Sequence, residues 1–516
     1  MAALITDGFR LLNADNFIES VSDPNNSYYI FVGLPNPVGN GYGRTLDWND
    51  DPPSPEDSIS YTRHVYDTML YGRRVTPANV KRIIRRIDWK QGTRYEQYRD
   101  DYSVGNVSPN TGATRLYDAN YYVITSEFRV YICLSNGSNG DNPKGNGSQD
   151  EPDFVDTEPS PAGTSGDGYI WKYLFTISPS DVIKFDSTEY ITVPSDWDTS
   201  TNPQIVAVRE SGDSDANNSQ IKQIYIDKSG EGYSGSLGQA LNIIGDGTGA
   251  EAIIDVSSGR ITRAIVARGG KGYSWGLVDL GNINKSASRA AKLDVIIPPS
   301  KGHGFDIYQE LGTDRAIVYA RFDDSTNDFP IDSKFAQVGL LKDPTIQGST
   351  AKFVENTFTA SESIKLDETI SGDLEIGEMI TQVTETGFTA KGYVASFDKS
   401  TMVLKYIQDR SLFYNPFTYD NQDYVGITTS GRKIAFESSG APIRGENGFS
   451  GSVDTTFNGA VAIIGDRNVD LGVEFTNGLA KSEINKPSGE ILYLNNRPEV
   501  KRNPRQKEDV KIILEF

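Results

Sequence analysis

The sequence has very little of the residue types on which most catalytic and metal sites depend. Its 516 residues include two histidines, His64 and His303, and one cysteine, Cys133. A single cysteine excludes an internal disulfide and is typical of a protein that matures in a reducing compartment. No nucleophile elbow, phosphate-binding loop, dinucleotide fingerprint or Cys-x-x-Cys motif is present. We therefore expect no enzymatic activity, no cofactor and no metal site, with these three residues in packing or surface roles.

Positive charge is also in short supply. The chain carries 50 Lys and Arg residues against 70 Asp and Glu residues, which gives a formal net charge of −20. A surface of this sign repels phosphate groups, so we expect no direct binding of nucleic acid. Long apolar runs are absent, and the first residues lack the charged start and apolar stretch of a signal peptide. We expect neither membrane insertion nor ordinary secretion.

What the sequence does contain is typical of a turn-rich β protein. It has 27 Tyr, 22 Phe and 50 Gly residues, and 37% of all residues are hydrophobic. Segments rich in β-branched and aromatic residues, which predict strands, lie at 28–33, 121–125, 130–134, 166–175 and 190–194. The length predicts several domains. We expect a mainly β fold with one or more short helices.

Residues 76–87 predict a helix. Thr76 is a typical N-cap and Pro77 a typical first helical residue. The apolar residues that would share one helix face are Val80, Ile83, Ile84 and Ile87. The opposite face would carry the candidate interface residues Lys81, Arg82, Arg85 and Arg86. Such a basic face can dock on an acidic neighbour, whereas the alternative is a solvated face that pairs with this chain's own carboxylates.

Residues 135–168 predict a long mobile loop. They are rich in Gly, Asn, Ser, Asp and Pro, with almost no apolar residue before Phe154. The clustered Asp and Asn residues do not follow the EF-hand spacing, so we expect no calcium site.

Two later segments predict additional small β modules. Within residues 206–297, the stretch 224–234 recurs as 264–274. The residues shared by the two copies are Gly230, Gly232 and Tyr233 in the first and Gly270, Gly272 and Tyr273 in the second. This repeat predicts a pseudo-repeated all-β module. Residues 346–484 are again rich in strand-like segments and predict a small barrel or sandwich.

Several stretches, taken in order along the chain, carry a family resemblance. They are 75–89 with 92–95, 166–175 with 189–194, a weaker match from 304 to 341, and 489–498 with 510–516. Together they resemble the gene product eight family of baseplate wedge subunits from T4-like contractile-tailed bacteriophages. The departures are the long loop after Leu134 and two insertions, and such long forms resemble those of phages that infect cyanobacteria.

The resemblance implies a β-sandwich core with two inserted small all-β domains. The core would be assembled from residues 1–205, 298–345 and 485–516. The insertions, 206–297 and 346–484, would emerge from its loops, because connecting loops tolerate long additions at modest entropic cost.

The resemblance also implies a structural role in the virion. The subunit would form a homodimer, join the other wedge proteins around the hub of the tail baseplate, and take part in the rearrangement that triggers sheath contraction. Assembly would take place in the cytoplasm of the host bacterium. Two alternatives stay open: a tail-associated module that binds host glycans on aromatic platforms and, less favoured, a tail enzyme that cleaves polysaccharide with two carboxylates in a groove.

Overall fold

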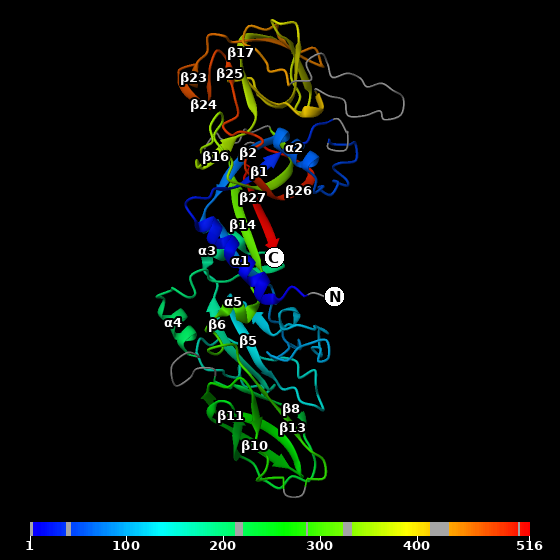
Figure 1. The fold of residues 1–516 in the computed structure, drawn as a ribbon, viewed down its shortest axis with the longest axis vertical. Coiled ribbons are helices and arrows are strands. Elements are labelled where there is room, and N and C mark those ends of the chain that lie inside the picture. The colour runs from blue at the N-terminus through cyan, green and yellow to red at the C-terminus, as the bar shows by residue number, and fades with distance from the viewer. Residues whose placement is uncertain are drawn as a thin grey trace. The chain divides into compact units, whose positions relative to one another are not determined.

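The protein is mainly β, as the sequence predicts, with a few short helices between the strands (Figure 1). The computed structural model describes residues 4–37, 43–211, 220–284, 287–323, 333–412, 433–503 and 506–516. The chain forms two compact units, each built from segments far apart in the sequence. Unit 1 comprises Met1–Asn16, Lys81–Ile317 and Ile513–Phe516, and unit 2 comprises Phe17–Val80 and Val318–Ile512.

Unit 1 combines an aromatic sheet with a small barrel-like module. Its helices are α3 (Pro179–Phe185), α4 (Pro203–Glu210) and α5 (Ile307–Leu311). Its strands are β4 (Tyr122–Ile124), β5 (Arg129–Asn136), β6 (Tyr169–Thr176), β7 (Tyr190–Thr192), β8 (Gln223–Lys228), β9 (Gln239–Gly245), β10 (Thr248–Ser257), β11 (Arg260–Lys271), β12 (Gly276–Val278) and β13 (Lys292–Ile296). The chain passes between the units within α1 (Asp7–Ser22), β3 (Val80–Arg85), β14 (Arg315–Phe322) and β27 (Glu508–Glu515).

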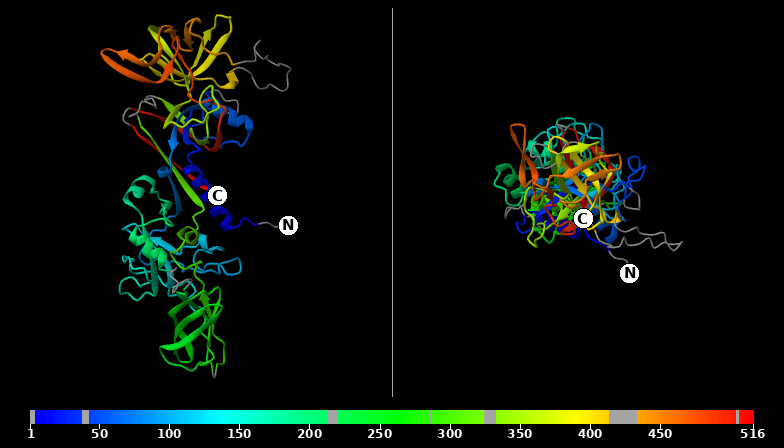
Figure 2. Two further views of the ribbon diagram at one scale, coloured as in Figure 1. Left: turned by 60° about the vertical axis from the view of Figure 1, so that its left-hand side comes forward. Right: turned by 90° about the horizontal axis from the view of Figure 1, so that it is seen from above.

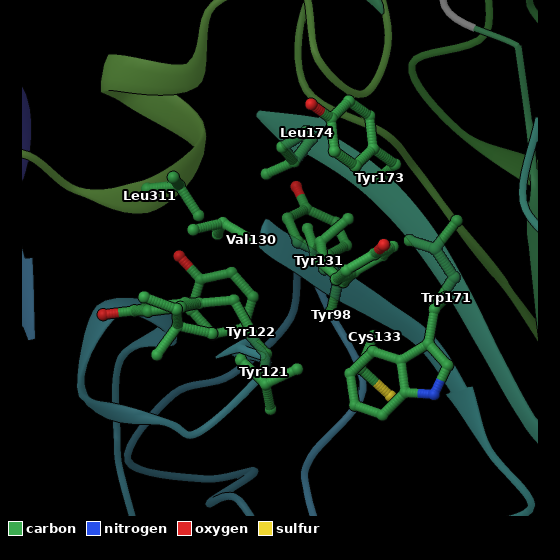
Figure 3. Close-up of a cluster of buried hydrophobic side chains, with 14 of the residues drawn as sticks. Tyr98, Tyr121, Tyr122, Val130, Tyr131, Cys133, Trp171, Tyr173, Leu174 and Leu311 are labelled. Atoms are coloured by element: carbon green, nitrogen blue, oxygen red, sulfur yellow. The ribbon is translucent and has the colours of Figure 1, made fainter. Parts of the chain in front are cut away.

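The antiparallel sheet β4-β5-β6 carries an aromatic core. Tyr122 lies opposite Ile132, and Cys133 lies opposite Trp171. Both Cys133 and Trp171 are fully buried, and Figure 3 shows them side by side among the surrounding tyrosines and aliphatic side chains. The cysteine is therefore a small core residue, as the sequence predicts.

The predicted loop at 135–168 contains no helix or strand after β5 ends at Asn136, but its contacts do not fit the expected mobility. Phe154 packs edge-on against Tyr131, with 5.4 Å between the ring centroids, and the Tyr131 hydroxyl donates to the Phe154 carbonyl at 2.5 Å. Ser148 and Ala162 are buried. The loop is thus fastened to the sheet by specific contacts at several points.

The internal repeat forms one module with its own hydrophobic core. Its strands are ordered β11-β10-β9-β12, with β13 and β8 as a separate pair, and they form the green module of Figures 1 and 2. Buried side chains from these strands, among them Leu241 and Ile254, form the core. Two hydrogen bonds join the segments around β8 to β11: Ile221 N–H donates to Gly269 C=O and Ile261 N–H donates to Ser229 C=O, both at 3.0 Å. The module is a small barrel in which β8 and β11 lie side by side and are joined by hydrogen bonds near their ends.

Unit 2 contains a sheet whose strands come from distant parts of the sequence, and a second barrel. Its elements are β1 (Tyr28–Gly33), α2 (Ile59–Thr68), β2 (Met69–Val75), β15 (Lys334–Lys342), β16 (Thr357–Thr359), β17 (Glu362–Ser371), β18 (Met379–Val383), β19 (Thr389–Asp398), β20 (Val403–Ile407), β21 (Ile443–Gly445), β22 (Ser450–Val453), β23 (Gly459–Ile464), β24 (Arg467–Phe475), β25 (Leu479–Ala480) and β26 (Glu490–Lys501). The sheet β20-β19-β18-β21-β22-β17 closes on itself because β17 also pairs with β20. The closed sheet surrounds a core that includes Ile364 and Leu404.

The other sheet of unit 2, in the order β16-β2-β1-β15-β26, takes strands from each of the three pieces assigned to the core by sequence. Residues 1–205, however, do not stay together, since the units divide them after Asn16 and after Val80. The described part of this segment accordingly contributes to two separate cores, one in each unit. The inserted domains and their boundaries stay a prediction.

The predicted helix at 76–87 is wrong. Pro77–Asn79 form a single 3-10 turn, with Pro77 at its first position, and the chain then continues as β3. The four apolar residues in question are β-branched, which favours a strand, and β3 pairs with β7 by setting Ile83 opposite Thr192 and Ile84 opposite Ile191. Ile83 and Ile84 are both buried although they lie on opposite faces of the strand. Apolar residues on both faces of β3 therefore gave the same spacing as one apolar face of a helix.

Candidate protein interface

The four candidate interface residues lie on a strand and not on a helix. Lys81, Arg82 and Arg85 belong to β3, and Arg86 follows directly after it. Because successive side chains of a strand point to opposite faces, Lys81 and Arg85 point away from the face that Arg82 and Arg86 occupy. The structure therefore does not bring the four cations together as the single basic face that the sequence predicts.

Arg82 is held on two sides within unit 1. Its guanidinium forms an ion pair with Asp15 and lies over the ring of Tyr308, 4.1 Å from the ring centroid. Burial lowers the pKa of Arg82, although nearby acidic groups oppose the effect, and an arginine stays charged in either case. This side chain fastens β3 to α1 and to the helix α5, on which Tyr308 lies.

Arg85 donates hydrogen bonds to the backbone of a neighbouring turn. Its guanidinium donates to the carbonyl oxygen of Tyr117 at 3.2 Å and to that of Ala119 at 2.9 Å. These carbonyls belong to the 3-10 turn Leu116–Asp118 and its C-cap. A planar group with several donors suits this task, since carbonyls at the end of such a turn have no partner within it.

Arg86 and Lys81 pair with carboxylates of their own chain. Arg86 contacts Asp88 at 2.9 Å and Asp186 at 2.6 Å. Lys81 lies 3.5 Å from Asp181 and donates to the Ser195 hydroxyl at 3.1 Å. All four cations thus have intramolecular partners, which favours the second of the two alternatives raised by the sequence. Their role at an interface with another subunit stays a prediction.

Sequence reasoning missed a buried ionisable cluster beside the aromatic core. His303 Nδ1 lies 2.5 Å from Glu310 Oε1, and the Gly304 N–H donates to Glu310 Oε2 at 2.7 Å. Lys172, on β6, donates to the Thr157 carbonyl at 2.6 Å, and burial lowers the pKa of Lys172 to about 8. Nothing in the sequence pointed to this cluster, because a lone lysine in an aromatic strand and a His-Glu pair seven residues apart match no known motif.

The other histidine is paired in a similar way in unit 2. His64, on α2, places its Nδ1 2.8 Å from Asp409 Oδ2, just beyond the end of β20. The adjacent Asp67 and Arg410 form a second ion pair at 2.7 Å. Both histidines are buried and serve packing, which is one of the two roles that the sequence predicts for them.

Within the described ranges, no three His, Cys, Asp or Glu side chains are grouped so that they could hold a metal ion. The helices of the same ranges include none with the length and apolar character needed to span a membrane.

Comparison with known proteins gives a match for the N-terminal part of the chain. Residues 3–225 match the model of the family described as Bacteriophage T4, Gp8. The baseplate wedge protein gp8 of Enterobacteria phage T4 is 29% identical over 216 residues, which represent 37% of this chain and 60% of that relative. The chain thus spans about 60% of the relative's length. The resemblance predicted from the sequence is confirmed over this region, which includes most of the aromatic core of unit 1.

Proposed function

We propose that this chain is a structural, non-enzymatic subunit of the baseplate wedge in a contractile phage tail, starting from its similarity to the Gp8 family over residues 3–225. The observation that carries the proposal is the relative that matches this region, which is itself a baseplate wedge protein. The subunit would reside in the tail baseplate of the virion after assembly in the host cytoplasm.

The side chains that an enzyme would use fit this proposal. Cys133 is fully buried, and burial raises the pKa of its thiol, so it is neither exposed nor ionised for nucleophilic attack. His64 and His303 are each buried against a carboxylate. These groups hold the fold together, which is what a subunit with a mechanical role needs.

The finer parts of the proposal concern assembly. We infer that the chain forms a homodimer, binds the other wedge proteins around the hub, and takes part in the rearrangement that leads to sheath contraction. The support is the family similarity together with the acidic charge of −20, which suits a protein that meets other proteins and not the phage genome.

A reconstitution experiment tests the proposal. The full chain is expressed with the other wedge proteins of the same phage, and the products are followed by sedimentation velocity and native mass spectrometry. We expect a dimer of the isolated chain at micromolar concentration and a discrete complex in the mixture. Antibody labelling of purified virions should mark the end of the tail that contacts the host. Label on the capsid alone, or no complex with any wedge protein, would refute the role.

Glycan binding has one observation in its favour. Trp275 is 55% exposed on the outside of the small barrel, next to the exposed Leu277. An exposed indole can stack on a sugar ring, and a glycan array probed with the full chain tests this alternative directly. Binding that is lost in Trp275→Ala, without any complex in the reconstitution, would favour it over the baseplate role.

A further inference from the structure

The hairpin of β23 and β24 in unit 2 carries apolar side chains on its outer face. The strands are joined by a turn at residues 465–466, and the hairpin lies at the outside of the second barrel (Figure 2, orange). One face of the hairpin packs inward, where Ala462 and Leu471 belong to a hydrophobic core. On the other face, Val461 and Ile463 are 50% and 76% exposed. β23 thus presents two neighbouring apolar side chains to solvent.

The edge of β23 that faces away from β24 is free. Within the described ranges, no other helix or strand runs along β23, and no main-chain hydrogen bond joins it to another segment. Ile464 lies opposite Arg467, and a hydrogen-bonded pair flanks such a two-residue turn. Ile464 and Ala462 therefore direct their N–H and C=O groups towards β24, whereas Ile463 and Val461 direct theirs away from it. Unpaired groups of this kind are a template for a further strand.

This edge also lacks the residues that usually protect an edge strand. Natural edge strands carry charged residues or proline, which discourage pairing with another chain. β23 contains neither, whereas β24 contains Arg467, Asp470 and Glu474. A single exposed apolar side chain needs no explanation. Here, however, exposed apolar side chains and unpaired main-chain groups occur together on one uncharged strand, which is typical of a site of association.

The absence of charge indicates which chain fits this edge. The protein has a net charge of −20, so most of its surface would repel a second copy. At β23, two copies would meet without placing like charges together. In an antiparallel pair centred on Ala462, Val461 of each copy lies opposite Ile463 of the other. Both positions then exchange main-chain hydrogen bonds, so the strand is complementary to itself, as a two-fold interface requires.

We propose that β23 pairs with β23 of a second copy of this chain across a two-fold axis. The two hairpins form one antiparallel sheet in the order β24-β23-β23-β24, and the side chains of Val461 and Ile463 pack against each other across the new strand pair. The proposal assigns a surface to the homodimer inferred above and rests on that inference. It makes the second barrel of unit 2 the part of the chain that holds the two copies together.

Sedimentation velocity of the full chain tests the surface. We expect Val461→Lys to raise the dissociation constant of the dimer about tenfold or more, which corresponds to about 1.4 kcal/mol. The physical reason is that the two-fold axis places the new charge of each copy against an apolar side chain of the other. The matched control is Val383→Lys, because Val383 is 52% exposed on β18 of the same unit and lies outside the hairpin. Its dissociation constant should equal that of the unchanged protein.

A cross-linking experiment tests the register of the strand pair. Val461→Cys and Ile463→Cys are prepared separately, one with an affinity tag, and are mixed under mild oxidation. The native Cys133 is buried and should not compete. Because Val461 faces Ile463 across the two-fold axis, we expect a disulfide-linked species that contains one chain of each variant. Each variant alone should cross-link far less.

The outcomes separate this surface from the homodimer itself. A dimer that Val461→Lys leaves intact and that gives no mixed cross-link would overturn the proposal, while the homodimer would stand. An unchanged protein that stays monomeric at micromolar concentration would overturn both. Hydrogen exchange of the segment 459–464 that slows only when another wedge protein is added would identify a different occupant of the edge and would likewise overturn the proposal.

Discussion

Tyr233 and Tyr273 are equivalent residues of the internal repeat, and both use their hydroxyl oxygens to accept main-chain hydrogen bonds in the core of the small barrel. Tyr233 accepts from the Ala291 N–H at 2.7 Å, and Tyr273 accepts from the Ala250 N–H at 3.3 Å. Each tyrosine follows two glycines with positive φ. The two copies of the repeat therefore form the same local structure, in which a glycine-containing turn follows a strand and places a tyrosine in the core.

The two glycines of the second copy should differ in their tolerance of a side chain. Both Gly270, with φ of 61°, and Gly272, with φ of 74°, favour glycine. A Cβ on Gly270 would lie 2.5 Å from the Thr248 carbonyl oxygen, whereas a Cβ on Gly272 would meet nothing within 4 Å. We expect Gly272→Ala to cost about 1 kcal/mol of unfolding free energy and Gly270→Ala clearly more. Hydrogen exchange of the barrel amides, measured by mass spectrometry, checks this, and equal protection in both variants would contradict it.

The Cys133 thiol should be inert in the folded protein. Burial raises its pKa well above the ordinary value, so the reactive thiolate does not form at pH 8. We expect no reaction with a disulfide reagent until denaturant unfolds the chain. Replacement by Ser or Ala should change stability modestly, by about 1 kcal/mol, and leave assembly with other wedge proteins intact. Rapid labelling of the native protein, or failed assembly of a stable Cys133→Ser variant, would show a role beyond packing.

Lys172 should make the folded protein more stable as the pH rises above neutral. Burial lowers its pKa from 10.5 to about 8, so the folded chain releases this proton at a pH where the unfolded chain still holds it. The unfolded state then binds more protons, and stability should rise with pH from about 8 towards 10.5, by at most about 1.4 kcal/mol per pH unit.

The comparison with Lys172→Met isolates this effect. Urea unfolding at pH 7.5, 8.5 and 9.5 gives the free-energy difference between the two proteins, and other titrating groups cancel. We expect the unfolding free energy of the unchanged protein to increase relative to that of the variant as the pH rises. A difference that stays constant over this range would mean that Lys172 titrates normally despite its burial.

Some features of the fold could be predicted because they are local. The strand at 28–33 and the buried Cys133 follow from side chains that favour strands whatever surrounds them. The helix α1 was missed because its sequence contains a glycine and two asparagines and lacks a clear apolar stripe. At 76–87 the apolar spacing matched a helix while the β-branched side chains matched a strand, and pairing with β7 decided the outcome.

The surroundings of the candidate site could not be predicted, since they depend on residues that are distant in sequence. Asp15 and Arg82 meet only because α1 and β3 come together in the fold. The buried ionisable cluster is similar, because Lys172 lies on β6 and Glu310 on α5, far apart in the sequence. The hydrophobic periodicity of one segment carries no information on contacts with residues that are distant in sequence.

The arginines after Val80 provide a test that separates an internal role from an interface. Arg82 loses an ion pair with Asp15 and its contact with Tyr308 when replaced by Gln, and Arg86 loses its pairs with Asp88 and Asp186. Because these partners lie in the same chain, we expect Arg82→Gln with Arg86→Gln to lower the unfolding free energy by about 1 to 3 kcal/mol. Urea unfolding measures the loss, and Arg289→Gln, which removes only an exposed pair, should stay within about 0.5 kcal/mol of the unchanged protein.

Binding to the other wedge proteins, measured at low and high salt under conditions where the variant is folded, should stay the same. Unchanged stability together with weaker, salt-sensitive binding would instead place these arginines at the interface with an acidic neighbour.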